Sequence, residues 1–198
     1  MNGLIIEGVA GTGKSTIISA LKDNNAFKRI KPSYEIIYED QTTGELVAEL
    51  RDKRLSDQDR YSKLNQLIPE IRRQHALGQF LILERFHPTF FALMAECVAF
   101  EDFDQQLSEL NFGLVLLDLP NNELEARSFS RPEMESQNWS KGLIDWYGSR
   151  EAALLAFAES QEKRRKFLMQ TKLKNIRIDT SGRSWDTYIK SIVEFVAE

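Results

Sequence analysis

The sequence contains a single cysteine, Cys97, so no disulfide can form within the chain and a reducing compartment is favoured. No apolar run approaches the ~18 residues that a membrane-spanning helix needs. The first residues lack the basic stretch and apolar segment of a cleavable leader. These absences together predict a cytoplasmic protein that does not enter a membrane.

An excess of positive charge is also absent. The 26 basic residues are outnumbered by 30 acidic residues, which gives a net charge of −4. This balance argues against a nucleic-acid polymer as the main partner, whereas a small phosphorylated ligand can be bound by a few arginines and backbone N–H groups. The two histidines, His75 and His87, do not have metal-ligand spacing, so we expect neither to hold a metal.

The strongest local pattern lies near the start of a chain whose 198 residues fit one domain, residues 1–198. Residues 8–15 read G-x-x-x-x-G-K-S, the Walker A pattern of a phosphate-binding loop. A short apolar strand at residues 4–6 precedes it, and residues 14–22 have helical spacing of apolar side chains. This strand–loop–helix context predicts an anion site at the start of a helix.

Each residue type in the loop has a physical role. The glycines allow the backbone to turn its N–H groups towards one anion. Lys14 is predicted to reach the β- and γ-phosphates, and the Ser15 hydroxyl to ligate Mg²⁺. The residues that we expect to bind the nucleotide are Gly8, Gly11, Thr12, Gly13, Lys14, Ser15 and Thr16.

Four further apolar segments predict strands at residues 34–38, 80–83, 113–119 and 175–179. Helical patterns lie between them, at residues 45–55, 57–77, 87–100, 123–129 and 143–171, and a last one covers residues 185–196. Five strands that alternate with helices predict an α/β three-layer sandwich with a five-stranded parallel sheet. Ligands of such sheets gather at the carboxyl ends of the strands.

Acidic residues stand at three predicted strand ends: Glu39 with Asp40, Glu84, and Asp118. Phosphoryl transfer needs carboxylates near Mg²⁺ and near the attacking hydroxyl. Glu84 could hold a magnesium-bound water or accept a proton, and Arg85 could bind a phosphate or a sugar hydroxyl. The alternatives are a surface ion pair for Glu84 and Arg85, loop acids for the first pair, and turn chemistry for Asp118.

Two arginines, Arg127 and Arg131, are four residues apart and precede a Ser/Pro break. We interpret them as a clamp over the phosphates, in a lid at about residues 127–142. A solvated helix end is the alternative. The more basic run at residues 163–166 is interpreted as a solvated part of a long helix.

Four stretches resemble the thymidylate kinase and deoxyribonucleoside kinase group of P-loop kinases. They are residues 8–16, 38–51 and 83–86, and residues 117–120 together with Arg127 and Arg131. The resemblance implies a P-loop NTPase fold, with ATP and Mg²⁺ bound at residues 8–16 and adenine near residues 180–183. It also implies that Glu39 and Arg85 line an acceptor pocket and that Arg127 and Arg131 belong to the lid.

The predicted activity is transfer of the γ-phosphoryl group of ATP to a nucleoside or nucleoside monophosphate, with Glu84 or Glu39 orienting the hydroxyl. Lys14, Arg85, Arg127 and Arg131 complete the predicted catalytic set. The segment after Phe86 and the residue Asp40 depart from the thymidylate kinase pattern, so the acceptor stays open among nucleosides, nucleotides and other small alcohols. A nucleotide switch is the alternative class, although the Asn-Lys-x-Asp guanine signature is missing. A homodimer also stays open.

Overall fold

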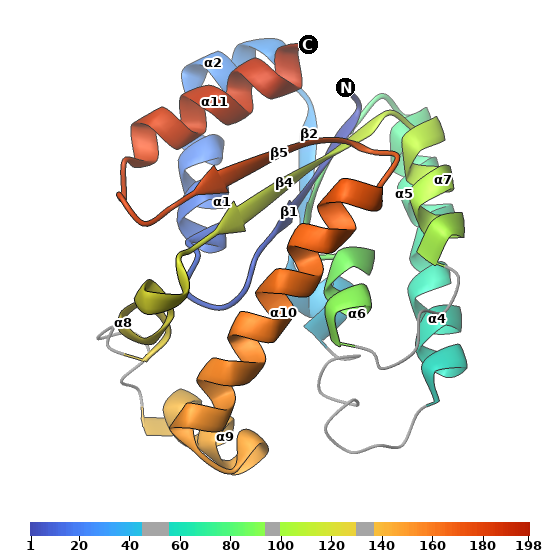
Figure 1. The fold of residues 1–198 in the computed structure, drawn as a ribbon. Helices are drawn as coiled ribbons and strands as arrows, with labels where there is room; N and C mark the ends of the chain where they lie inside the picture. Colours follow the sequence, from blue (N-terminus) through green and yellow to red (C-terminus); the bar gives the residue numbers. More distant parts are fainter. Residues whose placement is uncertain (45–55, 94–99, 130–136) are drawn as a thin grey trace.

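The structure is a computed structural model that describes residues 1–44, 56–93, 100–129 and 137–198. Five parallel strands form one sheet in the order β2-β3-β1-β4-β5 (Figure 1). The strands are β1 (Gly3–Glu7), β2 (Tyr34–Ile37), β3 (Phe80–Glu84), β4 (Phe112–Asp118) and β5 (Lys174–Asp179). The predicted five-stranded parallel sheet is confirmed. The helix predicted at residues 45–55, Cys97 and Arg131 lie outside the described residues.

β1 occupies the centre of the sheet and brings distant parts of the chain beside the segment that follows it. Ile6 pairs with Glu84 of β3 on one side and with Val115 of β4 on the other. The chain leaves β1 in the direction of β2 and leaves β4 in the opposite direction, towards β5. Such a divergence of connections opens a crevice at the carboxyl ends of the strands, which is where ligands of open α/β sheets bind.

Helices cover both faces of the sheet, which gives the predicted three layers (Figure 1). On one face lie α1 (Lys14–Asp23), α2 (Asn25–Ile30) and α11 (Trp185–Ala197). On the other lie α4 (Asp57–Asn65), α5 (Leu67–Ala76), α6 (His87–Leu93), α7 (Phe100–Glu109) and α10 (Arg150–Gln170). Leu4 and Ile6 of β1 pack in the apolar core under α1 and α11, whereas Ile5 packs in the core on the opposite face, under α5, α6 and α7. Burial on both faces explains why β1 is apolar along most of its length.

A smaller apolar cluster lies beyond the carboxyl end of β4. It joins α8 (Leu124–Ser128), α9 (Gln137–Tyr147) and the first half of α10 through Leu124, Leu143 and Phe157. Val9 of the loop after β1 belongs to the same cluster. Phe129 of the predicted lid belongs to this cluster too, so the start of the lid packs close to that loop and to the N-terminal half of α10.

Two long predicted helices are each divided in the structure. The helix predicted over residues 57–77 is split at Gln66 into α4 and α5. The helix predicted over residues 143–171 is split because Gly148 adopts a left-handed φ of 85° and Ser149 then caps α10, accepting a hydrogen bond from the Ala152 N–H at 3.1 Å. After this second break, Leu143 of α9 and Phe157 of α10 pack in the same apolar cluster.

Four helical segments, α2, α7, η1 (Asp40–Gly44) and η2 (Asn121–Glu123), were not expected from the sequence. The Asn24 side chain accepts a hydrogen bond from the Phe27 N–H and begins α2 directly after α1. The acidic segment after residue 100 forms α7, whose apolar side includes Phe103 and Leu107. The π-helix η1 follows β2, and the short 3₁₀-helix η2 precedes α8. None of the helices in the described ranges has the length and apolar run needed to cross a membrane.

Candidate active site

Gly11 and Gly13 are two positions at which the loop between β1 and α1 requires glycine. Gly11 and Gly13 have left-handed φ angles of 85° and 94°. A side chain at Gly11 would lie 2.5 Å from the backbone carbonyl oxygen of Arg127, and one at Gly13 would lie 2.5 Å from the ring of Trp185. Gly13 is also the N-cap of α1 and supplies no capping side chain. The first N–H groups of α1 are therefore left to an outside acceptor, as in helix-terminal anion sites.

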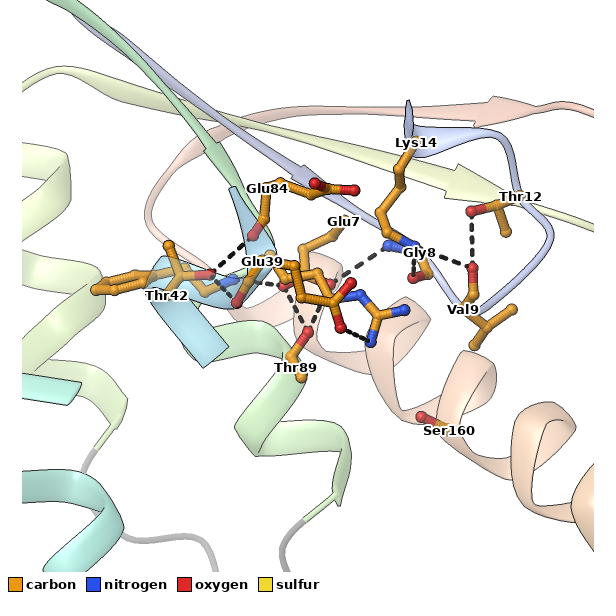
Figure 2. Close-up of polar contacts among 12 residues, drawn as sticks. Glu7, Gly8, Val9, Thr12, Lys14, Glu39, Thr42, Glu84, Thr89 and Ser160 are labelled. Carbon is orange, nitrogen blue, oxygen red and sulfur yellow. Dashed lines mark hydrogen bonds and ion pairs between the residues drawn. The ribbon is translucent and has the colours of Figure 1, made fainter. Parts of the chain in front are cut away.

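Lys14 lies over this loop and is almost completely buried (Figure 2). Its Nζ donates hydrogen bonds to the carbonyl oxygens of Gly8, at 3.0 Å, and Val9, at 3.3 Å. Burial, together with the positive charge of Arg85, lowers the pKa of Lys14 to about 7, although nearby carboxylates oppose the shift. An anion bound in the loop would favour the charged ammonium group and raise this pKa again.

A cavity of about 300 Å³ opens between this loop, the end of β3 and the helices α9 and α10. Eight of the residues predicted from the sequence line it: Gly11, Gly13, Lys14, Ser15, Thr16, Glu39, Glu84 and Arg85. Gly8 and Thr12 belong to the loop but not to the cavity wall, and Thr12 Oγ1 closes the turn by donating to the Val9 carbonyl at 2.9 Å. The structure therefore brings most of the predicted site residues together.

Glu39 and Arg85 form an ion pair at 3.1 Å on the cavity wall. Only 14% of the Arg85 side chain is exposed, against 35% for Glu39, so the pair is not an ordinary surface pair. Arg85 has a φ of 58°, which is uncommon for a residue other than glycine, and its N–H donates to the Ile6 carbonyl at 3.0 Å. Among the described residues, its buried Nε has no hydrogen-bond partner. Unusual backbone geometry and an unsatisfied polar atom both point to a functional position.

Glu84 ends β3 and is largely buried, yet it borders the cavity. Its backbone carbonyl accepts a hydrogen bond from Thr42 Oγ1 at 2.9 Å, so η1 is attached to the end of β3 (Figure 2). Ser15, at the start of α1, is exposed in the same cavity. A hydroxyl and a carboxylate are oxygen ligands of the kind that Mg²⁺ prefers, so these two residues fit the ion that the loop pattern implies.

Glu7 is a site residue that the sequence analysis missed. It is completely buried at the end of β1, and its carboxylate accepts hydrogen bonds from the N–H groups of Gly8 and Phe86 at 3.3 and 2.9 Å. Thr89 Oγ1 of α6 donates to it at 2.9 Å, and Arg164 Nε of α10 donates at 3.2 Å. One carboxylate thus joins the phosphate loop, the turn after β3 and two helices.

The prediction that residues 163–166 are solvated is wrong for the two arginines of the run. Arg164 is only 3% exposed and lines the cavity, and Arg165 pairs with the buried Asp118 at 2.9 Å. Arg164 lies on the same side of α10 as the buried Phe157 and Phe167. Residues three or four apart lie on the same side of a helix, and Arg164 is three residues before Phe167 and seven after Phe157. This spacing could have predicted from the sequence that Arg164 faces inward. Burial lowers the pKa of Arg164, and the charge of Glu7 opposes this shift.

Arg127 lies beneath the loop rather than in the cavity. It is fully buried, its Nε donates to the Gly11 carbonyl at 3.2 Å, and its Nη1 donates to the Thr180 carbonyl at 3.1 Å. Its guanidinium also lies over the ring of Trp185, 5.7 Å from the centroid. In this conformation Arg127 supports the loop from behind, and the phosphate clamp predicted for it and Arg131 remains a prediction.

The segment after β5, where the resemblance implies adenine, is a tight turn. The Ser181 N–H donates to the Asp179 carboxylate at 2.8 Å, and the Arg183 N–H donates to the Thr180 carbonyl at 3.2 Å. Asp118, the third acidic strand end, does not line the cavity and is instead paired with Arg165 and Arg177.

Known proteins resemble this chain in structure only. No protein-family model matches the sequence. No curated protein matches it significantly. The structure is similar to the Bacillus subtilis YorR protein, solved in complex with phosphorylated GDP, with a TM-score of 0.62 and 17% identity over 98% of this chain and 95% of that one.

Two thymidylate kinases are also similar in structure. The enzyme from Candida albicans has a TM-score of 0.61 and 18% identity over 98% of this chain and 90% of that one. The enzyme from Ehrlichia chaffeensis has a TM-score of 0.57 and 13% identity over 99% and 98%. These similarities confirm the α/β P-loop NTPase fold and the resemblance to thymidylate kinases as a likeness of fold.

Proposed function

We propose that the protein is a phosphotransferase that moves the γ-phosphoryl group of ATP to a nucleoside or nucleotide acceptor. The observation that carries the proposal is one cavity whose wall contains two chemically different groups of residues. The first group, which we call the donor end, is Lys14 with the open N-terminus of α1, and it suits phosphate. The second, which we call the acceptor end, is the Glu39–Arg85 ion pair, and it suits a hydroxyl or phosphate of a second molecule. The fold shared with solved thymidylate kinases supports the same class of reaction.

The donor end would bind the triphosphate through backbone N–H groups and Lys14. The Lys14 ammonium now donates to two loop carbonyls and would turn from these to the β- and γ-phosphates. Ser15 and Glu84 would hold Mg²⁺, with phosphate and water oxygens as the remaining ligands. When bound, this ion supplies charge neutralisation for the transferring phosphoryl group.

The acceptor end would act mainly by positioning. Glu39 and Glu84 both reach the cavity, and either could orient the attacking group. Arg85 is fixed by its ion pair and by the hydrogen bond of its N–H to Ile6, so it can locate the acceptor oxygen near the γ-phosphorus. Glu7 and Arg164 would hold the phosphate loop in place against α10, because their ion pair connects the end of β1 with that helix.

ADP release in the presence of candidate acceptors tests the proposal. The purified protein is incubated with MgATP and a panel of nucleosides and nucleoside monophosphates, and ADP is followed by a coupled assay. We expect at least one acceptor to raise ADP formation well above the rate without acceptor. If none does, and the phosphorylated product is absent by mass spectrometry, the phosphotransferase assignment fails.

A further inference from the structure

The positive and negative charges of the ionised side chains at the cavity balance one another in the described residues. Among the residues that the structure describes, three cationic side chains line the wall, two carboxylates line it with them, and a third carboxylate lies directly behind. The cations are Lys14, Arg85 and Arg164, and the carboxylates are Glu39, Glu84 and Glu7. The described part of the site therefore has no surplus positive charge beyond what its own carboxylates balance.

Both arginines of the cavity are already engaged by carboxylates. Arg85 is paired with Glu39 at 3.1 Å. Arg164 is paired with Glu7 at 3.2 Å, and its Nη1 also donates to the carbonyl and hydroxyl oxygens of Ser160. Phosphate groups are usually recognised by arginines whose planar guanidinium is open to two oxygens. All three guanidinium nitrogens of Arg164 are engaged, because its Nη2 donates to Thr89 Oγ1. Arg85 keeps an Nε without a partner among the described residues, but a phosphate bound there would lie beside the Glu39 carboxylate with which Arg85 is paired.

A phosphorylated acceptor would add a second anion to this balanced site. A triphosphate remains negatively charged overall when Mg²⁺ is bound, and Lys14 is the lysine of the described cavity wall that would contact it. A phosphomonoester would bring a further charge of about −1.5 to −2 close to the γ-phosphate. In a partly buried cavity such like charges repel strongly unless additional cations lie between them.

A hydroxyl group suits the Glu39–Arg85 pair better than a phosphate does. A hydroxyl donates one hydrogen bond and accepts others, and here a carboxylate acceptor lies beside a guanidinium donor. The unpartnered Nε shows that Arg85 has hydrogen-bonding capacity beyond the ion pair. Farther along the wall lie Trp146 and Tyr147, whose rings are stacked with centroids 4.9 Å apart. Flat aromatic surfaces of this kind suit a planar base.

From these contacts we propose that the acceptor is an uncharged nucleoside rather than a nucleoside monophosphate. The inference rests on the proposed phosphotransferase function and narrows it. The acceptor oxygen forms a bond to the γ-phosphorus as the bond between this phosphorus and the β–γ bridging oxygen breaks. The hydroxyl proton passes to the Glu39 carboxylate and then to solvent, and the products are ADP and a nucleoside monophosphate.

Matched acceptor pairs test the inference. Each nucleoside and its own 5′-monophosphate are supplied with MgATP at one ionic strength, and the products are identified by mass. We expect kcat/KM for the nucleoside to exceed that for its monophosphate by about 100-fold or more, because uncompensated like charges oppose binding. If the monophosphates are the better acceptors, the inference is overturned while the phosphotransferase function stands, and cations outside the described residues complete the site. If neither class is phosphorylated, the function fails and the inference with it.

A Glu39→Gln variant provides a second readout. It removes the proton acceptor and one negative charge, so kcat with the nucleoside should fall by about 100-fold or more. The preference for nucleoside over monophosphate should also shrink by about tenfold or more, because repulsion of the second phosphate is reduced. Glu125→Gln is the matched control, since it breaks the exposed ion pair of Glu125 with Arg150, which has the same 3.1 Å separation. A Glu39→Gln variant with unchanged kcat and unchanged preference overturns the inference.

Discussion

Glu7 and Arg164 are 157 positions apart in the sequence and form an ion pair at 3.2 Å in which both side chains are almost completely buried. Thr89 lies between them, because it donates to the Glu7 carboxylate and accepts a hydrogen bond from Arg164 Nη2. The pair therefore attaches α10 to the end of β1, one residue before the phosphate loop begins. Its effect on the site is to fix the distance between the loop and the opposite wall of the cavity.

Replacing Arg164 with methionine should destabilise the fold. The change leaves the Glu7 carboxylate buried without its cation, and losing one partner of a buried pair costs about 3–5 kcal/mol. Urea unfolding of the wild type and of Arg164→Met measures the difference. Lys166→Met, an exposed change on the same helix, is the control and should alter the unfolding free energy by less than about 0.5 kcal/mol. A loss below about 1 kcal/mol in Arg164→Met would mean that the pair does not hold the two elements together.

Replacing Lys14 should abolish phosphoryl transfer and preserve the fold. Lys14 lines the cavity, and within the described ranges its side chain donates hydrogen bonds to two carbonyls of its own loop, so it does not attach a distant element to the loop. We expect Lys14→Ala to lower kcat by about 10²-fold or more, the scale of losing one transition-state charge contact. Circular dichroism checks the fold, and Lys190→Ala, an exposed lysine of α11, is the control. Unaltered turnover in Lys14→Ala would contradict the assignment of the loop.

The lowered pKa of Lys14 predicts how stability depends on pH. In the folded protein Lys14 loses its proton near pH 7, whereas in the unfolded chain it keeps it up to about pH 10.4. Between these values the unfolded state binds more protons, so this group makes the unfolding free energy rise with pH. The difference in unfolding free energy between wild type and Lys14→Met should therefore move in favour of the wild type from pH 7 to pH 10. A difference that is flat or moves the other way would show that the ammonium group is not desolvated.

Substitutions of Arg127 and Arg131 should have different effects, the first on ATP binding and stability and the second on the rate of the chemical step. Arg127 is buried against the carbonyls of Gly11 and Thr180, so Arg127→Ala should loosen the loop, weaken ATP binding and lower stability by about 1–3 kcal/mol. For Arg131→Ala we predict a slower chemical step with a modest change in ATP affinity, as a clamp on the transferring group requires. Calorimetric ATP affinity and single-turnover rates of both variants distinguish the roles. A large loss of ATP affinity at unchanged turnover in Arg131→Ala would move that arginine from catalysis to binding.

The parts of the site that follow from local sequence were predicted. The glycines, Lys14 and Ser15 lie within one short pattern whose geometry is determined by the loop itself. Glu39, Glu84 and Arg85 were predicted because they end strands, and the carboxyl ends of parallel strands converge at one edge. These residues are far from the phosphate loop in the sequence, but the parallel sheet brings the ends of their strands close to it.

The rest depended on pairings that no local pattern contains. Glu7 is the last residue of β1, directly before the glycine-rich loop, and nothing near it in the sequence indicates its partner Arg164, which lies in a basic run typical of a solvated helix. The inward direction of Arg127 depends on Thr180, which follows a different strand. The break between α9 and α10 at Gly148 was also not predicted. The helical pattern of the sequence continues on both sides of Gly148, and a single glycine within such a pattern is often tolerated.

Titration calorimetry with magnesium and a non-hydrolysable ATP analogue tests the central claim, that the loop after β1 binds a triphosphate. The account predicts a complex of one nucleotide per chain that is lost in Lys14→Ala and retained in Lys190→Ala. Proton uptake should accompany binding near pH 8, because the bound phosphates restore the charge of Lys14. Absence of binding heat in the wild type, or equal affinity in Lys14→Ala, would contradict it.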